Sequence, residues 1–408
     1  MTFAKKSVSP ILSRCVVALA LALPVQAYAQ TPAESSAPVT APAATAAALP
    51  GDLSIVPPPG LTAPAWLSMD VNSGQVIAAE RIDERVEPAS LTKIMTAYLV
   101  FDALESGRLK LDQAVNISEK AWRTEGSRMF VKVNTQVPVD ALLQGVIVQS
   151  GNDASVALAE AVAGSESAFA ALMNEQAAKL GLTATHFVNS TGLPDPAHLT
   201  SVRDLATLAA ALVSRFPQYL HYYSQKEFAY NNIKQPNRNR LLWLDNTVDG
   251  LKTGHTQSAG YCLVSTAMRD GRRIVSVVVG TASDNARTEN SLKLLNWSFQ
   301  NFETVKLYDA GNPAVNARVW EGTVENVGLG TAAPLWLTVP RGKSAQIKPV
   351  AQYTQPLVAP LSKGAKVGTL TLTLDGKTLS EQPLVVLDDV PEAGFFGRMV
   401  DKVRLMFE

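Results

Sequence analysis

Apolar and polar residues follow different patterns in successive stretches of the chain. Residues 65–80 contain two apolar runs separated by Asn-Ser-Gly at 72–74, and this turn signal predicts a β-hairpin. From Ser90 to about Leu104 apolar residues occupy nearly every face of the predicted helix, which is typical of a helix that runs through a core. Residues 261–281 again contain two apolar runs, here separated by Arg-Asp-Gly, and predict a second hairpin.

Helical periodicity fills the region between the two hairpins. The predicted helices lie at 139–148, 154–163, 167–180, 204–213 and about 287–299. Because strands come from both ends of residues 61–302 and helices from the middle, we expect an α/β domain with one antiparallel sheet and helices packed on it. Beyond this domain, alternating runs separated by Gly and Pro predict a small all-β domain over residues 303–390.

The first 29 residues have the pattern of a secretory signal peptide. Three basic residues precede an apolar run at 15–23, and Ala-Tyr-Ala at 27–29 provides a cleavage site. An uncleaved N-terminal anchor is the alternative, but the run is too short to span a bilayer comfortably. We therefore expect export and cleavage, followed by a Pro/Ala-rich linker over residues 30–60.

The last residues, 391–408, are strongly amphipathic. At about 100° per residue, seven apolar side chains of this segment fall in one arc of roughly 140°. These side chains are Phe395, Phe396, Met399, Val400, Val403, Met406 and Phe407. A terminal helix docked on the β domain is one interpretation. Adjacent phenylalanines at the end of an exported chain favour the other, a helix that anchors the protein on a membrane surface.

Composition narrows the function further. The 36 Lys+Arg balance the 36 Asp+Glu, which argues against a polybasic nucleic-acid binder and an acidic tail. Loss of the signal, which has three basic residues and no acidic one, leaves a formal net charge of −3. Cys262 is then the remaining cysteine and is expected to be a buried thiol. No metal and no cofactor are expected, because the four histidines lack ligand spacing. They are His186, His198, His221 and His255.

Three short motifs carry the candidate chemistry. They are Ser90-Leu91-Thr92-Lys93, Ser150-Gly151-Asn152 and Lys252-Thr253-Gly254. In this order they match the S-x-x-K, S-x-N and K-T-G set of penicillin-recognising serine enzymes. Ser90 and Lys93 share one helix face, and a desolvated lysine can take the proton of the serine during attack on a carbonyl. A helix N-terminus would also place backbone N–H groups near a developing oxyanion.

The other motifs suit substrate binding. On a loop between helices, Ser150 could relay a proton and Asn152 could hold a substrate amide. A simple helix N-cap at Asn152 or Asp153 is the alternative, and it would be the better interpretation if this motif stood alone. Lys252 and Thr253 can bind a carboxylate, and Gly254 lets a substrate backbone approach; the alternative is an ordinary turn before a strand. Arg238 is a candidate second carboxylate ligand, or else an ordinary surface arginine.

From about residue 61 to the C-terminus, the chain resembles low-molecular-weight penicillin-binding proteins of the serine-type D-alanyl-D-alanine carboxypeptidase class. The segments that carry the resemblance include EPASLTKIMTAYLV, SGNDASVALAE, VDGLKTGHT and AGYCLVSTA. It implies a penicillin-binding/β-lactamase-like transpeptidase fold. It also implies removal of the terminal D-Ala from peptidoglycan stem pentapeptides, acylation by β-lactams, and a place at the periplasmic face of the inner membrane.

The resemblance also implies roles for individual residues. Ser90 would be acylated, with Lys93 as its base, and Ser150 and Asn152 would form the second element. The remaining implied residues bind or support the substrate. The backbone N–H groups of Ser90 and His255 would form an oxyanion hole, Lys252 and Arg238 would hold the terminal carboxylate, and Asp204 would support the site.

Three alternatives stay open at this point. A serine β-lactamase shares the first and third motifs, but no Glu-x-x-Leu-Asn run follows Ser150. Endopeptidase cleavage of cross-links would use the same machinery. A binding or scaffolding module of the cell envelope would use the β domain, and a broken motif would indicate it, whereas here all three motifs are intact.

Overall fold

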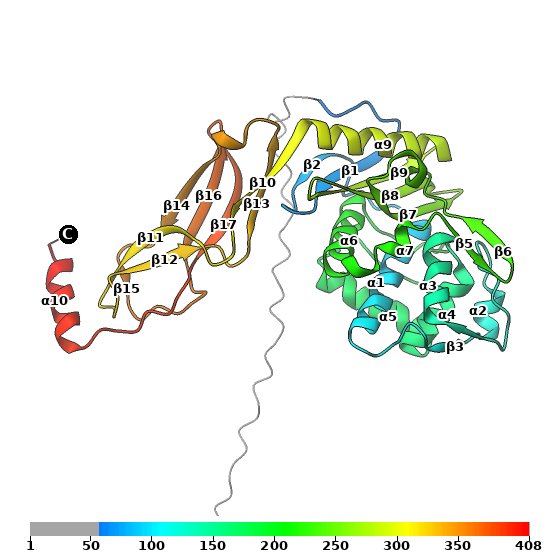
Figure 1. Ribbon diagram of the computed structural model, residues 1–408, viewed down its shortest axis with the longest axis horizontal. Coiled ribbons are helices and arrows are strands. Elements are labelled where there is room, and N and C mark those ends of the chain that lie inside the picture. Colours follow the sequence, from blue (N-terminus) through cyan, green and yellow to red (C-terminus); the bar gives the residue numbers. More distant parts are fainter. Residues whose placement is uncertain (1–56, 408) are drawn as a thin grey trace, which may run out of the picture. The chain divides into compact units, whose positions relative to one another are not determined.

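The computed structural model describes residues 57–407 (Figure 1). The predicted signal peptide, residues 1–29, and residues 30–56 of the predicted linker lie outside the described residues. Two regions follow one another along the described chain. The first combines helices with an antiparallel sheet, and the second consists almost entirely of strands.

A five-stranded sheet in the order β2-β1-β9-β8-β7 forms the centre of the first region, and all its neighbours are antiparallel. Its strands are β1 (Ala65–Asp70), β2 (Val76–Glu80), β7 (Val248–Thr256), β8 (Gly260–Arg269) and β9 (Arg272–Thr281). Both predicted hairpins are confirmed. The expectation that the Lys252 motif precedes a strand was wrong, because Lys252, Thr253 and Gly254 lie inside β7 at an edge of this sheet.

Helices cover both faces of the sheet (Figure 1). Side chains of a strand alternate between its faces, so Trp66 and Leu67 of β1 enter different cores. Trp66 packs in the core that includes Leu294 and Trp297 of α9 (Asp284–Asn301). Leu67 packs in the larger core on the other face, which helices from the middle of this region enclose, while Leu241 and Leu242 belong to the core that contains Trp66. The sheet is therefore the middle of three layers.

The other helices of this region are α1 (Lys93–Glu105), α2 (Glu119–Arg123), α3 (Val139–Val148), α4 (Asn152–Ala163), α5 (Glu166–Lys179), α6 (Val202–Arg215), α7 (His221–Ser224) and α8 (Leu241–Leu244). The longer helices agree with the sequence pattern, whereas the short helices α2, α7 and α8 were not predicted. As predicted, α1 is buried on nearly all sides. It begins at Lys93 and not at Ser90, because Ser90 lies in a preceding 3-10 turn, η1 (Ala89–Thr92).

Two short two-stranded sheets escaped the sequence pattern. They are β3 (Ala114–Asn116) with β4 (Gln136–Pro138), and β5 (Glu227–Tyr230) with β6 (Ile233–Pro236). Strands of three or four residues give too few alternations to be recognised by period. Among residues 57–407 no single helix is long and apolar enough to cross a membrane, although the bent pair of α4 and α5 has the length and composition to do so.

The second region confirms the predicted all-β domain. A six-stranded sheet has the order β14-β16-β17-β12-β11-β15, and β10 pairs with β13. The strands and one 3-10 turn are β10 (Phe302–Tyr308), β11 (Pro313–Trp320), β12 (Asn326–Gly330), β13 (Leu335–Pro340), η3 (Ser344–Gln346), β14 (Lys348–Tyr353), β15 (Leu357–Val358), β16 (Lys366–Leu374) and β17 (Lys377–Val386). They enclose a core of their own.

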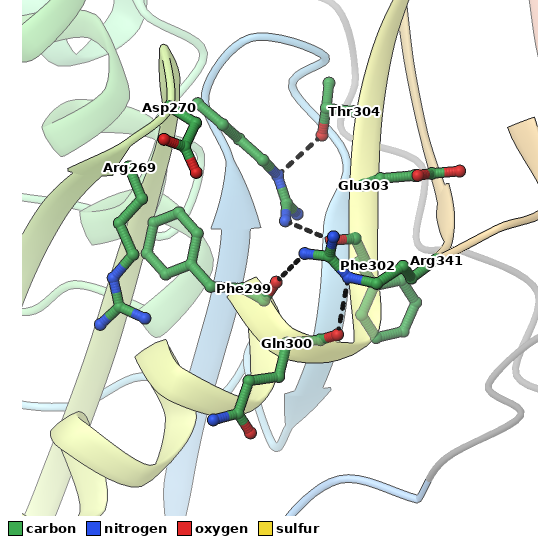
Figure 2. A pocket seen from close by; sticks show the side chains of 9 residues that line it. Arg269, Asp270, Phe299, Gln300, Phe302, Glu303, Thr304 and Arg341 are labelled. Atoms are coloured by element: carbon green, nitrogen blue, oxygen red, sulfur yellow. Dashed lines mark hydrogen bonds between the residues drawn. The ribbon is translucent and has the colours of Figure 1, made fainter.

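The chain passes from α9 into β10 beside a cavity of about 490 Å³ (Figure 2). Arg341 donates to the carbonyl oxygens of Phe299 at 2.6 Å and Gln300 at 2.9 Å, and Arg272 donates to that of Phe302 at 2.7 Å. These carbonyls belong to the last turn of α9 and the residue after it, where carbonyl groups have no hydrogen-bond partner within the helix. Two guanidinium groups therefore satisfy the C-terminal end of α9.

The predicted terminal helix is present as α10 (Phe395–Leu405). Its apolar side chains are exposed, with Phe396 at 81% and Phe407 just beyond the helix at 86%. The contact with the β domain comes from its polar side, where the Asp401 carboxylate accepts the backbone N–H of Glu321 at 2.8 Å. The apolar face of α10 is therefore not the face that meets the β domain.

Candidate active site

The side-chain nitrogen of Lys93 connects the first two motifs. Lys93 Nζ lies 3.2 Å from Ser90 Oγ, 2.7 Å from Asn152 Oδ1 and 2.6 Å from the carbonyl oxygen of Thr191. The lysine is only 1% exposed. The sequence brought Ser90, Lys93 and Asn152 together correctly. It did not indicate Thr191, which contributes a main-chain atom and so carries no side-chain signature.

The surroundings of Lys93 favour its neutral form. Burial lowers its pKa from 10.5 to about 7, and the positive charge of Arg238 acts in the same direction. Asp153 and Glu166 oppose this shift by their negative charges. A lysine with a pKa near 7 exchanges protons readily at neutral pH.

Ser90 is presented by a tightly packed turn. The preceding residue, Ala89, has a φ of 48°, in the left-handed region that L-residues seldom adopt. Strand β7 crosses η1 so closely that a Cβ on Gly254 would lie 3.1 Å from the carbonyl oxygen of Pro88 and 3.3 Å from the backbone nitrogen of Leu91. The sequence argument assigned the small size of Gly254 to substrate approach. The protein itself also needs it, because a larger residue would push β7 away from η1.

The second motif begins in a loop and ends in a helix. Ser150 lies between α3 and α4 with a φ of 62°, and its buried hydroxyl has no hydrogen-bond partner among residues 57–407. Asn152 was expected on the loop but is the first residue of α4, and Gly151 occupies the N-cap without a side-chain bond. The amide of Asn152 is held at both ends, since Nδ2 donates to the carbonyl oxygen of Glu125 at 2.6 Å. The N-cap interpretation of Asn152 was wrong.

Asp153 has a structural role that the sequence reasoning missed. Its carboxylate accepts the backbone N–H groups of Met129 at 3.0 Å, Phe130 at 2.9 Å and Val131 at 3.1 Å. It also accepts the N–H of the next residue, Ala154, at 2.9 Å. The acid therefore ties the segment before α3 to the start of α4, beside Asn152.

The third motif places a second buried lysine near the first. Lys252 is 3% exposed, and its Nζ donates to the carbonyl oxygen of Thr253 at 3.0 Å. Burial lowers its pKa well below 10.5, and the charges of Lys93, Arg238 and Arg287 lower it further. The predicted gathering of Lys93, Lys252 and Arg238 is therefore present in the structure.

Three residues beside the third motif, Arg238, Arg287 and His255, differ in their accessibility. Arg238 is exposed. Its backbone oxygen accepts from Arg287, which is also within reach of the carbonyl oxygen of Gly254 at 3.4 Å. Arg287 is buried and was not singled out in the sequence, where it read as an ordinary helix residue. His255 is exposed, and its ring lies 4.1 Å from that of Tyr261.

Asp204 binds the segment between α5 and α6. Its Oδ2 accepts the N–H of Ala184 at 2.9 Å and the hydroxyl of Thr185 at 2.6 Å. These contacts hold the segment between α5 and α6, which also carries Thr191. Asp204 makes no hydrogen bond with a motif residue in the part of the chain that the structure describes.

A cavity of about 410 Å³ adjoins these groups. Its lining includes Thr191 and Glu125, whose carbonyl oxygens bind Lys93 and Asn152 respectively. Its rim also carries the ion pair of Lys120 with Glu166 at 2.8 Å. Within residues 57–407, no group of three or more His, Cys, Asp or Glu side chains is placed to hold a metal ion.

Known families match both regions of the chain. Residues 53–283 match the family described as D-alanyl-D-alanine carboxypeptidase. The chain belongs to this family. Residues 302–392 match the C-terminal domain of penicillin-binding protein 5. D-alanyl-D-alanine carboxypeptidase DacC of Escherichia coli K12 is 45% identical over 357 residues, which cover 86% of this chain and 89% of the relative.

Solved structures share the fold. Penicillin-binding protein 5 from Haemophilus influenzae superposes with a TM-score of 0.81 at 43% identity, covering 83% of this chain and all of the other. Penicillin-binding protein D2 from Listeria monocytogenes in its ampicillin-bound form gives a TM-score of 0.55 at 30% identity, covering 60% of this chain and all of the other. The chain therefore has the α/β fold of penicillin-binding proteins, followed by an all-β domain and a terminal helix.

Proposed function

We propose that Ser90 is the nucleophile with which this D-alanyl-D-alanine carboxypeptidase removes the terminal D-Ala from peptidoglycan stem pentapeptides. The main support is the contact between Ser90 Oγ and Lys93 Nζ at 3.2 Å. Because the pKa of Lys93 lies at about 7, a large fraction of the lysine is neutral at neutral pH. A neutral amine beside a serine hydroxyl acts as a general base.

The partners of Lys93 also orient its lone pair. The oxygens of Asn152 and Thr191 can only accept, so each takes one of the two hydrogens of a neutral amine. The lone pair is then left for Ser90, whose hydroxyl can donate. The lone pair of the neutral lysine therefore points toward Ser90, the neighbour from which the lysine must take a proton.

The reaction follows in two stages. Ser90 Oγ attacks the carbonyl carbon of the penultimate D-Ala, its proton passes to Lys93, and the C–N bond to the terminal D-Ala breaks. The leaving amine takes up that proton through Ser150, whose hydroxyl has no other partner among the described residues. Water then hydrolyses the ester, which releases the shortened peptide and restores the Ser90 hydroxyl.

The remaining site residues hold the substrate. Lys252, Thr253 and Arg238 bind the carboxylate of the terminal D-Ala, and an extended peptide can pair with the free edge of β7. The second amide hydrogen of Asn152 is available to a substrate carbonyl. The backbone N–H groups of Ser90 and His255 stabilise the oxyanion.

A β-lactam acylates the same serine. It presents an amide carbonyl and a carboxylate, which are the two groups that the site is built to hold. The ampicillin-bound penicillin-binding protein D2 supports this proposal. Removal of the terminal D-Ala also withdraws the pentapeptide from cross-linking, so the enzyme would regulate cross-linking during cell-wall biogenesis.

A fluorescent penicillin tests the assignment. We expect covalent labelling of the wild type and of Ser167→Ala, an exposed serine that serves as a matched control, and none of Ser90→Ala. The wild type should also release D-Ala from a pentapeptide analogue that ends in D-Ala-D-Ala. Residual labelling of Ser90→Ala would refute the nucleophile, and labelling without D-Ala release would refute the carboxypeptidase activity.

We further propose that the protein is exported, loses residues 1–29 and lies at the periplasmic face of the inner membrane. The terminal helix α10 would hold it there as an in-plane anchor. Support comes from the exposure of its apolar side chains and from the polar contact of Asp401 on its other side.

A further inference from the structure

We propose that His198 is a positioning residue for the nucleophile, because its Nε2–H tautomer holds Thr92 and thereby the carbonyl group of Ala89. The peptide that joins Ala89 to Ser90 supplies the N–H of Ser90, so His198 fixes an oxyanion donor without contacting the substrate. This inference rests on the proposed role of Ser90. It assigns a role to the segment between α5 and α6, which the three motifs do not cover.

The hydrogen bonds around His198 define its tautomer. Nδ1 lies 3.1 Å from the backbone nitrogen of Val188, and Nε2 lies 2.8 Å from Thr92 Oγ1. A backbone N–H can only donate, so Nδ1 must accept and the ring proton must be on Nε2. Nε2 therefore donates to Thr92, whose hydroxyl donates in turn to the carbonyl oxygen of Ala89 at 2.8 Å.

The carbonyl group of Ala89, at the end of this chain of hydrogen bonds, has to be held in place. Ala89 has a φ of 48°, which is unfavourable for a residue with a Cβ. A Cβ on Gly192 would lie 1.8 Å from the carbonyl oxygen of Ala89, so a second part of the same segment packs directly against this peptide. Gly192 has a φ of 81°, which glycine adopts without strain. The Thr92 hydroxyl and the Gly192 backbone together confine the Ala89 carbonyl.

Peptide geometry transmits this constraint to the site. The carbonyl oxygen of Ala89 and the N–H of Ser90 belong to one planar group, so they cannot rotate independently. Fixing the oxygen on one side therefore fixes the N–H on the other. An N–H fixed in this way stabilises the oxyanion without reorganising during the reaction.

Burial favours the neutral form of His198. Burial lowers its pKa to about 4, and the positive charges of His186 and Lys93 act in the same direction, while Asp195 and Glu87 oppose them. The side chain is 2% exposed. Protonation would place an N–H on Nδ1 against the N–H of Val188, so the chain of hydrogen bonds holds only in the neutral form.

Two amide substitutions separate the two contacts of the ring. In His198→Gln the amide nitrogen reaches the position of Nε2 and can still donate to Thr92. In His198→Asn the shorter amide reaches only the position of Nδ1 and keeps the contact with Val188 alone. We expect the acylation rate constant with a fluorescent penicillin to fall about tenfold or more in His198→Asn and to stay within about threefold of wild type in His198→Gln. The dissociation constant of the non-covalent complex should not change in either variant.

A second pair tests the route through Thr92. Thr92→Ser keeps the hydroxyl and should acylate like wild type, whereas Thr92→Val should lose about as much as His198→Asn. Because both substitutions break the same chain, the double variant His198→Asn/Thr92→Val should be no slower than either single variant. Additive losses would overturn the proposal, as would wild-type acylation by His198→Asn.

The outcomes also distinguish this inference from the proposed function. If His198→Asn fails to fold, as judged by circular dichroism, the comparison of Thr92→Val with Thr92→Ser decides, and equal acylation overturns the inference. Failure of the wild type to be labelled would instead refute the role of Ser90. Labelling that depends on Ser90 but not on His198 or Thr92 would refute the positioning role alone.

Discussion

Lys93 Nζ lies closer to Asn152 Oδ1, at 2.7 Å, than to Ser90 Oγ, at 3.2 Å. Of these two groups, the amide oxygen is therefore the stronger hydrogen-bond partner of the lysine. Once the lysine has given up a proton, the Ser90 hydroxyl can donate a hydrogen bond to it. A protonated lysine donates its three hydrogens to its three partners, whereas the neutral amine has a lone pair that can accept the hydrogen of Ser90. The protonation state of Lys93 should then control the rate of acylation.

Acylation should have a bell-shaped pH dependence. The acid limb reports Lys93, so the rate should rise as pH increases through about 7 and reach a plateau once the lysine is neutral. Arg238, Asp153 and Glu166 set this midpoint together with burial. The alkaline limb reports Lys252, whose lowered pKa makes the site lose a carboxylate ligand below the usual pKa of lysine. Stopped-flow labelling with a fluorescent penicillin from pH 5 to 10 measures both limbs.

A substrate without a carboxylate provides the control for this profile. An ester or thioester that lacks the terminal carboxylate does not need Lys252 as a cation, so it should keep the acid limb and lose the alkaline one. An acid limb that stays at the same pH after Arg238→Ala would contradict the electrostatic origin of the midpoint, because loss of that positive charge should raise the pKa of Lys93.

Asn152→Asp should move the acid limb to higher pH. A carboxylate 2.7 Å from Lys93 Nζ would stabilise the ammonium form, and an opposite charge at such a distance shifts a pKa by about 1–3 units. At pH 7 the acylation rate should therefore fall about tenfold or more and recover in part at higher pH. Asn152→Ala is the matched variant. It removes the contacts that Asn152 makes with Lys93 and Glu125 and adds no charge. Equal midpoints in the two variants would show that the amide oxygen does not set the protonation of Lys93.

The sequence predicted the parts of this site that side-chain identity encodes. Ser90, Lys93 and Asn152 were recognised because their types and spacing carry the chemistry, and both hairpins of the central sheet were recognised from their turns. Thr191 was missed because it acts through a main-chain oxygen that any residue has. His198 was considered only as a metal ligand, and its contact with Thr92, 106 positions away in the chain, was missed. Local periodicity holds no information on such contacts.

The same limit applies to the ends of elements. Lys252 was placed before a strand but lies inside β7, where Gly254 serves the close crossing of β7 over η1. Asp153 was one candidate for the N-cap of α4, yet Gly151 occupies that position, and the Asp153 carboxylate accepts three N–H groups of the segment before α3. A pattern along one strand or helix does not report which other segment packs against it.

Deletion of residues 393–408 should release the exported protein from membranes. The anchor should act through apolar burial, because residues 391–408 carry three basic and three acidic residues and gain little from anionic lipid. In flotation with zwitterionic vesicles, Phe395→Ser/Phe396→Ser should weaken binding about tenfold or more, since each phenylalanine side chain contributes about 1.5–3 kcal/mol when fully buried. Arg398→Gln, on the polar side, is the control. Binding that disappears at high salt, or that survives the deletion, would contradict an apolar anchor.

His198 should make the catalytic region less stable in mild acid. Its pKa is about 4 in the folded chain against an ordinary 6.5, so between these values the unfolded chain binds more protons than the folded one. This contribution is fully present above pH 6.5 and is lost as pH falls toward 4, with a slope of up to about 1.4 kcal/mol per pH unit. Because glutamine does not titrate, His198→Gln should remove that slope, and the free energy of unfolding of the two proteins should converge or cross as pH falls. Urea denaturation followed by the helical circular dichroism signal measures the difference at each pH. A constant difference between wild type and variant from pH 7 to pH 4 would mean that the imidazole is not held neutral by the fold.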